Sequence, residues 1–242
     1  MIADFRVALA FLTVVPVGAP DSESPGRAFA YFPLVGLMIG LVLALTTALL
    51  SPVFSRELTA FCTLLIWVLL TGGLHLDGFG DACDGLLAAV EPARRLEIMK
   101  DSRAGSWAVI GLVLLLLGKW LALQAASPAA LILAPVMGRW VMVIAAQGFP
   151  YVRTSGLGAY FRQGLTYRQV IAATAQIMVV TLVCAAIRDV RLALLILIPP
   201  ILALILGRWA VRRLGGGLTG DVYGALCETT EWLILLAASV LR

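Results

Sequence analysis

Charged residues are scarce in this chain. Asp, Glu, Lys and Arg make up 13% of its 242 residues and hydrophobic residues 61%, whereas soluble domains carry roughly 25% charged residues. Together with a mean hydropathy of +0.99, this composition predicts a membrane protein. The net charge of +4 does not indicate a nucleic-acid partner, because the basic cytoplasmic loops of membrane proteins give the same excess.

Cysteine pairs, sequence repeats and low-complexity tracts are also missing. The four cysteines lie far apart without a C-x-x-C pair, which argues against both disulfides and a zinc site. Three of them lie in apolar runs, where cysteine packs as a small hydrophobic residue. Because nothing marks a domain boundary, we expect residues 1–242 to form a single integral-membrane domain.

Long apolar runs, in contrast, are abundant. They predict an all-α, polytopic membrane helical bundle of about seven spanning helices. These are expected near residues 28–50, 58–74, 106–126, 129–149, 170–187, 192–211 and 218–240. The sixth contains Pro199-Pro200, which should break it near its middle.

Two shorter apolar segments are predicted to lie at the membrane surface. Residues 5–17 are too few to cross a hydrocarbon core of about 30 Å, so we expect a short N-terminal interfacial or re-entrant helix. A cleaved signal peptide is the alternative, which Asp4 disfavours. Residues 86–99 combine an apolar face with Glu91 and Arg95 at helical spacing, and they predict an amphipathic helix on the cytoplasmic face.

Basic residues fall mainly on one side of this predicted topology, namely the side of the loop at 77–105. That side holds Arg6, Arg27, Arg94, Arg95, Lys100, Arg103, Arg153, Arg162, Arg168, Arg212 and Arg213. The other side holds only Arg56, Arg188, Arg191 and Arg242. Since Lys and Arg are enriched in cytoplasmic loops, the loop at 77–105 is predicted to face the cytoplasm.

The most informative polar segment is Gly72-Gly73-Leu74-His75-Leu76-Asp77-Gly78-Phe79-Gly80-Asp81-Ala82-Cys83-Asp84-Gly85, called the acidic segment below. Its aspartates are spaced by four and three residues, so a helix would place them on one face, although the glycines argue against a rigid helix throughout. Clustered carboxylates repel one another unless a cation neutralises them. Oxygen ligands of this kind suit Mg²⁺, and a solvated acidic loop is the alternative.

Two further polar segments share the predicted cytoplasmic side. The basic segment, Lys100-Asp101-Ser102-Arg103-Ala104-Gly105-Ser106, offers cations and a helix N-terminus to a phosphate; a positively charged membrane anchor with a Ser cap is the alternative. The glycine-rich segment, Gly215-Gly216-Gly217-Leu218-Thr219-Gly220-Asp221-Val222-Tyr223-Gly224, precedes the last predicted span. Candidate phosphate ligands in the two segments are Lys100, Ser102, Arg103, Gly217 and Thr219.

Ionisable residues also lie inside the predicted spans. Glu228 and Glu231 share one side of the last span with Asp221, and Lys119 and Arg139 belong near mid-membrane. They are expected either to pair with one another or to line a pocket that opens to the cytoplasm. The only histidine, His75, precedes Asp77 by two residues and is either a base or a hydrogen-bonding neighbour of the acidic segment.

Together, the acidic segment, Met99-Lys100-Asp101-Ser102-Arg103-Ala104-Gly105 and Gly217-Leu218-Thr219-Gly220-Asp221-Val222-Tyr223-Gly224 resemble the cobalamin synthase family. Its members are also called adenosylcobinamide-GDP ribazoletransferases or cobalamin 5'-phosphate synthases. The resemblance covers essentially the whole chain and implies a vitamin B12 biosynthesis transferase in the bacterial cell inner membrane, with its active site facing the cytoplasm. The ribose 3'-hydroxyl of α-ribazole, or of its 5'-phosphate, would attack the diphosphate of adenosylcobinamide-GDP, and GMP would leave.

The resemblance also implies roles for the candidate residues. Mg²⁺ on the diphosphate would be held by Asp77, Asp81 and Asp84. Two further catalytic candidates, Asp101 and Asp221, would complete the metal shell or take the ribose proton. His75 is a catalytic candidate only as a base. The implied partners are the two substrates and the lipid bilayer, without nucleic acid. The sequence leaves open a homo-oligomer and contacts with other corrinoid-assembly enzymes.

Two other readings compete with this one. Residues 81–88 fit the first half of the D-x-x-D-G-x-x-A-R pattern of CDP-alcohol phosphotransferases, but Ala89 stands where arginine is expected and no second half follows. A transporter would explain charged residues inside the spans. Transporters, however, often contain paired broken helices, and only the Pro199-Pro200 break is obvious here. A transporter would also be expected to carry charged groups at both membrane faces, whereas the polar segments here all fall on one predicted side. The sequence therefore favours an enzyme.

Overall fold

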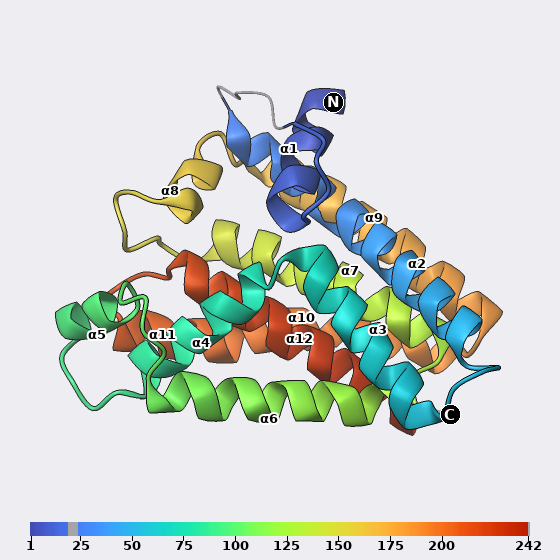
Figure 1. Cartoon of the computed structure of the whole chain (residues 1–242). Helices are drawn as coiled ribbons and strands as arrows, with labels where there is room; N and C mark the ends of the chain where they lie inside the picture. Colours follow the sequence, from blue (N-terminus) through green and yellow to red (C-terminus); the bar gives the residue numbers. More distant parts are fainter. Residues whose placement is uncertain (19–23, 242) are drawn as a thin grey trace.

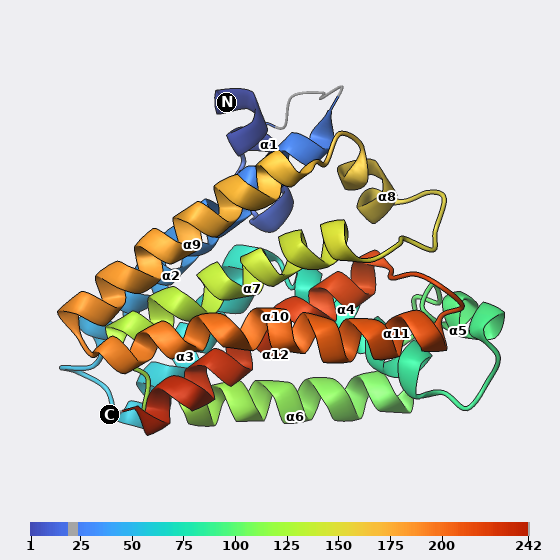
Figure 2. The same cartoon turned by 180° about the vertical axis from the view of Figure 1, so that it is seen from behind.

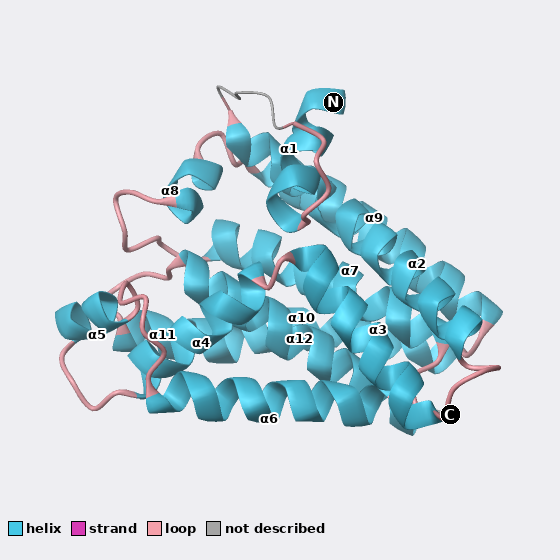
Figure 3. Ribbon diagram, in the orientation of Figure 1, coloured by secondary structure: helices cyan, strands magenta, loops and turns pink. Residues whose placement is uncertain are grey.

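The computed structural model describes residues 1–18 and 24–241, and this part of the chain is built from helices (Figure 3). Its one β contact is an isolated bridge between Tyr151 and Leu218. The predicted all-α class is therefore confirmed for the described residues. In chain order the elements are α1 (Ile2–Leu12), the 3-10 helix η1 (Pro25–Tyr31), α2 (Phe32–Leu50), α3 (Arg56–Thr71), α4 (Leu74–Leu87), α5 (Pro92–Ile98), α6 (Ser106–Leu123), α7 (Pro128–Gly148), α8 (Leu157–Arg162), α9 (Tyr167–Ile187), the 3-10 helix η2 (Val190–Leu197), α10 (Ile198–Leu202), the π-helix η3 (Ala203–Gly207), α11 (Arg208–Arg213) and α12 (Gly220–Val240).

Five helical stretches of the described chain are long and apolar enough to cross a membrane. They cover 25–50, 106–123, 128–148, 167–187 and 190–213. Helices α3 and α4 pass the same test only as a pair, and the chain bends by 90° between them. Gly72 and Gly73 make this bend with φ of 62° and 68°, a region that favours glycine.

The stretch from 190 to 213 corrects one prediction. Pro199 and Pro200 do not break it, because they occupy the first turn of α10, directly after η2. Proline is tolerated there, since the first backbone N–H groups of a helix lack a partner in any case. The prolines therefore mark a change of helix type within one span.

Helix α7 forms the centre of the bundle, with α2 and α9 along one side and α12 and α10 along the other (Figures 1 and 2). Glycines allow the close approach of α2, because a Cβ on Gly36 or Gly40 would lie within 2.7 Å of the α7 backbone. Small residues serve this purpose in membrane proteins, where helices associate through close packing.

The predicted cytoplasmic loop at 77–105 is largely helical instead. The acidic segment continues through its glycines as α4, which packs between α6 and α12. A Cβ on Gly78 would lie 3.1 Å from the Cα of Asp221, and one on Gly224 would lie 3.1 Å from the carbonyl oxygen of His75. The glycines therefore bring α4 and α12 into contact, which tertiary packing rewards despite their low helix propensity.

The expected surface helices are shorter than predicted. Residues 5–17 contribute to α1, which ends at Leu12, and the amphipathic helix expected over 86–99 is reduced to α5, Pro92–Ile98. The predicted contact between Glu91 and Arg95 is replaced, because Arg95 is buried and donates to the carbonyl oxygens of Gly85 and Leu86, both at 2.9 Å.

Candidate active site

Three segments far apart in the sequence meet at one end of the bundle. In Figure 1, α5, the loop before α6 and the end of α11 lie together at the left, and the C-terminus lies at the opposite end. Arg213 joins the end of α11 to the C-terminal end of α4 by donating to the carbonyl oxygens of Leu86 and Ala88 at 2.8 and 3.0 Å. Arg95 and Arg213 thus place positive charge at the C-terminal end of α4, where the helix dipole favours it.

The aspartates of the acidic segment share one face of α4, as predicted, but their surroundings differ. Asp77 and Asp81 line a pocket of about 310 Å³, called the donor pocket below. Asp84 instead accepts hydrogen bonds from the backbone N–H groups of Gly105 at 2.6 Å and Ala108 at 2.9 Å. Both of its oxygens therefore cap the start of α6.

The basic segment forms the facing part of the donor pocket. Lys100 and Ser102 are exposed and line it. Asp101 also lines it and accepts hydrogen bonds from the side chain of Arg103 at 2.9 and 2.6 Å. These bonds hold the pKa of Asp101 well below its ordinary range. Arg103 is thereby engaged in shaping the loop, and Lys100 is the cation of this segment that borders the pocket.

The glycine-rich segment has mainly structural contacts. Gly217 packs closely on the backbone of the loop after α7, because a Cβ on Gly217 would lie 2.8 Å from the nitrogen of Val152. The hydroxyl of Thr219 accepts from the N–H of Val222 at 3.4 Å and caps α12. Both residues are buried. Asp221, in the first turn of α12, is the carboxylate of this segment that reaches a pocket.

Sequence reasoning missed Arg153 and Tyr151, which complete the polar part of a second pocket of about 260 Å³, called the acceptor pocket below. Arg153 pairs with Asp221 at 2.9 Å, and the Tyr151 hydroxyl accepts from the N–H of Gly220 at 3.2 Å. Burial raises the pKa of Tyr151. The fold brings this loop to the start of α12, in part through the bridge between Tyr151 and Leu218, and one arginine among many in the basic loops carries no local signal.

Asp77 connects the two pockets, because it lines both. Asp221 and Asp77 place further negative charge close to Asp81, and Arg153 partly offsets it. Among the described residues, neither Asp77 nor Asp81 forms an ion pair, whereas Asp221 does. Two unpaired carboxylates beside Lys100 form a site that attracts both a cation and a phosphate.

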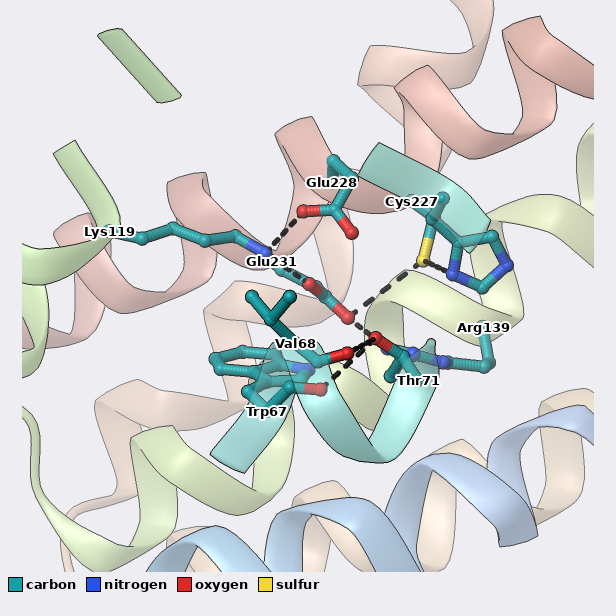
Figure 4. Close-up of polar contacts among 9 residues, drawn as sticks. Trp67, Val68, Thr71, Lys119, Arg139, Cys227, Glu228 and Glu231 are labelled. Carbon is teal, nitrogen blue, oxygen red and sulfur yellow. Dashed lines mark hydrogen bonds and ion pairs between the residues drawn. The ribbon is translucent and has the colours of Figure 1, made fainter. Parts of the chain in front are cut away.

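The ionisable residues inside the bundle form a separate network (Figure 4). Lys119 contacts Glu228 and Glu231, each at 2.5 Å, and Arg139 pairs with Glu231. The first of the two predicted arrangements, mutual pairing, is therefore the observed one. The network is buried and joins α6, α7 and α12.

His75 lies between the network and the acceptor pocket. It is 4% exposed, and its Nδ1 lies 3.6 Å from the sulfur of Cys227, which in turn lies 3.8 Å from a carboxylate oxygen of Glu231. Its backbone carbonyl contacts Gly224 of α12. His75 thus connects the first turn of α4 to the buried network.

Comparison with known proteins gives a consistent family assignment. Residues 4–239 match the family model described as cobalamin-5-phosphate synthase. The chain belongs to this family. It is 40% identical to the adenosylcobinamide-GDP ribazoletransferase of Stutzerimonas stutzeri over 97% of its own length and 96% of the relative's. It is 38% identical to that of Herpetosiphon aurantiacus, over 100% and 98% of the two chains. No solved structure matches it.

The family resemblance implies magnesium, and the donor pocket offers a narrower ligand set than predicted. Within residues 1–18 and 24–241, no three His, Cys, Asp or Glu side chains gather closely enough to hold a metal ion. Asp84 is engaged by amides, which leaves Asp77 and Asp81. Two carboxylates fit Mg²⁺, since this ion is usually held by one or two protein carboxylates together with waters and substrate phosphates.

Proposed function

We propose that this protein is a membrane transferase that joins adenosylcobinamide-GDP to α-ribazole, or to α-ribazole 5'-phosphate, and releases GMP. The family match and the printed activity of the relatives support this reaction. The observation that carries it here is the donor pocket, in which the unpaired Asp77 and Asp81 meet Lys100 and Ser102. Such a pocket suits a diphosphate, which needs cations around its oxygens.

The diphosphate of adenosylcobinamide-GDP occupies the donor pocket in this proposal. Lys100 and Ser102 contact its non-bridging oxygens, and Asp101 holds Arg103 and the loop in place through the bonds described above. Asp77 and Asp81 would hold Mg²⁺, which would supply charge neutralisation for the diphosphate and its leaving group. Asp84 fixes the start of α6 beside the pocket.

The acceptor approaches from the other side of Asp77. Its ribose 3'-oxygen attacks the phosphorus that carries the cobinamide arm, and a new phosphodiester forms. The bond from this phosphorus to the bridging oxygen breaks, and GMP leaves with that oxygen. Asp221 accepts the hydroxyl proton as general base, and its contact with Arg153 at 2.9 Å holds it in the acceptor pocket.

We also propose that the pockets face the cytoplasm of a bacterial cell, from its inner membrane. Both pockets lie at the end of the bundle that carries the basic loops, including Lys100, Arg153 and Arg213. The positive-inside rule assigns this end to the cytoplasm. Cysteine labelling in intact cells tests the orientation: a cysteine placed at exposed Ser102 should react only after the membrane is opened, whereas one at exposed Ser51 should react directly.

The reaction is tested with purified protein in liposomes, supplied with adenosylcobinamide-GDP, α-ribazole and Mg²⁺. We expect GMP release and cobalamin formation in equal amounts, both lost when Mg²⁺ is chelated. Asp81→Asn should lower both by about 10²–10³-fold. The matched control is Asp189→Asn, because Asp189 lies outside both pockets and pairs with Arg191 at 2.6 Å. Well-folded wild-type protein that makes no product would contradict the proposal.

A further inference from the structure

The acceptor pocket has two chemically different parts. Its charged side chains, Asp77, Arg153 and Asp221, come from α4, α12 and the loop before α8. Much of its remaining surface is apolar, including phenylalanines from α1, η1, α2 and α8. In both views of the bundle α1 and α8 lie above α4 and α12 (Figures 1 and 2). The pocket therefore has a charged side and an apolar side.

Four phenylalanines form the apolar side, called the aromatic wall below: Phe11, Phe29, Phe32 and Phe161. The ring centroids of Phe11 and Phe161 are 4.1 Å apart, and those of Phe29 and Phe32 are 4.5 Å apart. Each ring comes from a different helix. Phe11 is half-buried, and Phe29, Phe32 and Phe161 are buried where they line the pocket. Chain segments far apart in the sequence thus converge to build one apolar side of the pocket beside the charged groups.

The aromatic wall is fixed to the charged side by specific hydrogen bonds. Arg162, next to Phe161, donates to the carbonyl oxygen of Phe149 at 2.7 Å and to the hydroxyl of Tyr223 at 3.1 Å. The N–H of Gly26 donates to the carbonyl oxygen of Gln163 at 2.8 Å, which ties η1 to the end of α8. These bonds set the distance between the rings and Asp221, so the pocket is prepared for a ligand with two parts.

Resting on the proposed function, we infer that the aromatic wall binds the base of α-ribazole and directs its ribose toward Asp77 and Asp221. The benzimidazole base is flat and largely apolar, so it gains from contact with aromatic rings. Guanine carries donors and acceptors along its edges, which the phenylalanine rings leave unpaired at a cost. The corrin macrocycle with its side chains exceeds a pocket of about 260 Å³.

This assignment separates the two substrates on either side of Asp77. The acceptor nucleoside enters the acceptor pocket, and the diphosphate of the donor enters the donor pocket. The ribose hydroxyl then meets the diphosphate at the carboxylate shared by both pockets. The aromatic wall would then discriminate between acceptor nucleosides with different bases, because a base with polar edges loses hydrogen bonds to water when it enters the pocket.

Phe161→Leu tests the inference, since it removes a flat ring and keeps most of the apolar volume. We expect the KM and the directly measured Kd for α-ribazole to rise by about tenfold, with the KM for adenosylcobinamide-GDP changed by less than about twofold. Phe161→Tyr should narrow the preference for α-ribazole over the corresponding adenine riboside, because it adds a polar group to the wall. The control is Phe61→Leu, whose ring is 53% exposed on the outer face of α3.

The outcomes separate the inference from the proposed function. Active wild-type protein whose Phe161→Leu variant binds α-ribazole normally would overturn the inference alone. A rise in the KM for adenosylcobinamide-GDP instead would assign the pocket to the donor and overturn it as well. Wild-type protein without any turnover would contradict the proposed function and the inference with it. Equal melting temperatures of the variants in detergent show that the changes report binding.

Discussion

Two groups of carboxylates in this bundle have opposite surroundings. Glu228 and Glu231 are 5% and 0% exposed, and Lys119 and Arg139 neutralise them. Asp77 is exposed and Asp81 half-buried, and neither pairs with a cation of the described chain. A buried carboxylate must be paired to be tolerated. A carboxylate at a pocket is solvated by water, so it can stay unpaired and remain available to a ligand. Pairing therefore distinguishes the buried Glu228 and Glu231 from Asp77 and Asp81, which border a pocket.

Helix α12 contains both kinds. Its first turn carries Asp221 beside the acceptor pocket, and two turns later Glu228 enters the buried network. Asp221 combines features of the two groups, because it pairs with Arg153 and also borders a pocket. One helix thus connects the polar interior of the bundle to the site.

The largest effect should come from opening the buried network. Arg139→Met leaves Glu231 with Lys119 alone, and Lys119 is already shared with Glu228. Breaking a buried ion pair costs about 3–5 kcal/mol, so the unfolding free energy in detergent should fall by that amount. Arg208→Met serves as the control, since Arg208 is exposed on α11. A loss below about 1 kcal/mol would show that the network does not hold the bundle together.

The opposite result is expected for the unpaired group. Asp81→Asn should not lower the melting temperature, since no cation of the described chain loses a partner and the repulsion from Asp77 and Asp221 is relieved. Turnover should fall by about 10²–10³-fold, the usual effect of removing one electrostatic contact to a transition state. Binding of Mn²⁺, followed by electron paramagnetic resonance, should weaken in parallel. Unchanged Mn²⁺ affinity with lost activity would count against Asp81 as a metal ligand.

A double substitution tests whether the charges of Lys119 and Glu228 are energetically coupled. Lys119→Met alone leaves Glu228 buried without its cation and should destabilise the protein strongly. Adding Glu228→Leu removes that uncompensated charge, so the double variant should recover about 1–3 kcal/mol. Thermal unfolding of the two variants side by side measures the coupling. Additive losses would mean that Lys119 and Glu228 act independently.

Asp84 lies on the same face of α4 as Asp81 but is occupied by amides. In Asp84→Asn, the side-chain amide nitrogen cannot accept one of these two hydrogen bonds. The loss of a cap costs about 1 kcal/mol, which should appear as a lower melting temperature with turnover reduced by less than about tenfold. Loss of Mn²⁺ binding in this variant would show that Asp84 is a metal ligand, as the sequence predicted.

The class of the fold and most helix positions follow from the sequence, because apolar runs of about 20 residues have one stable arrangement in a membrane. The continuity of α4 did not follow. Gly78, Gly80 and Gly85 predict an irregular backbone, yet α4 needs them to approach α12, α6 and Met99. Close packing between helices stabilises glycine at these positions, and helix propensity, which depends on local sequence alone, does not include this packing energy.

The donor pocket was partly predictable for a similar reason. Clustered carboxylates and a nearby cation can be read locally, and Asp77, Asp81 and Lys100 do meet. The division of labour among them depends on contacts across the fold, such as the bonds from Gly105 and Ala108 to Asp84. The aromatic wall draws one ring from each of four helices, and no spacing in the sequence reveals such a set.

The smallest effect is expected at Asp101, whose pairing with Arg103 resembles the buried network in geometry but is exposed to water. Water screens exposed ion pairs, so they contribute little. Asp101→Asn should change turnover by less than about threefold. Lys100→Ala should change it far more, because Lys100 borders the pocket and has no ion pair within the described part of the chain. Because the pKa of Asp101 is lowered, its carboxylate stays charged, and the pair persists, from about pH 8 to about pH 5. The acid limb of a pH–rate profile should therefore be the same in Asp101→Asn and wild type, and a shifted limb would identify Asp101 as the proton acceptor in place of Asp221.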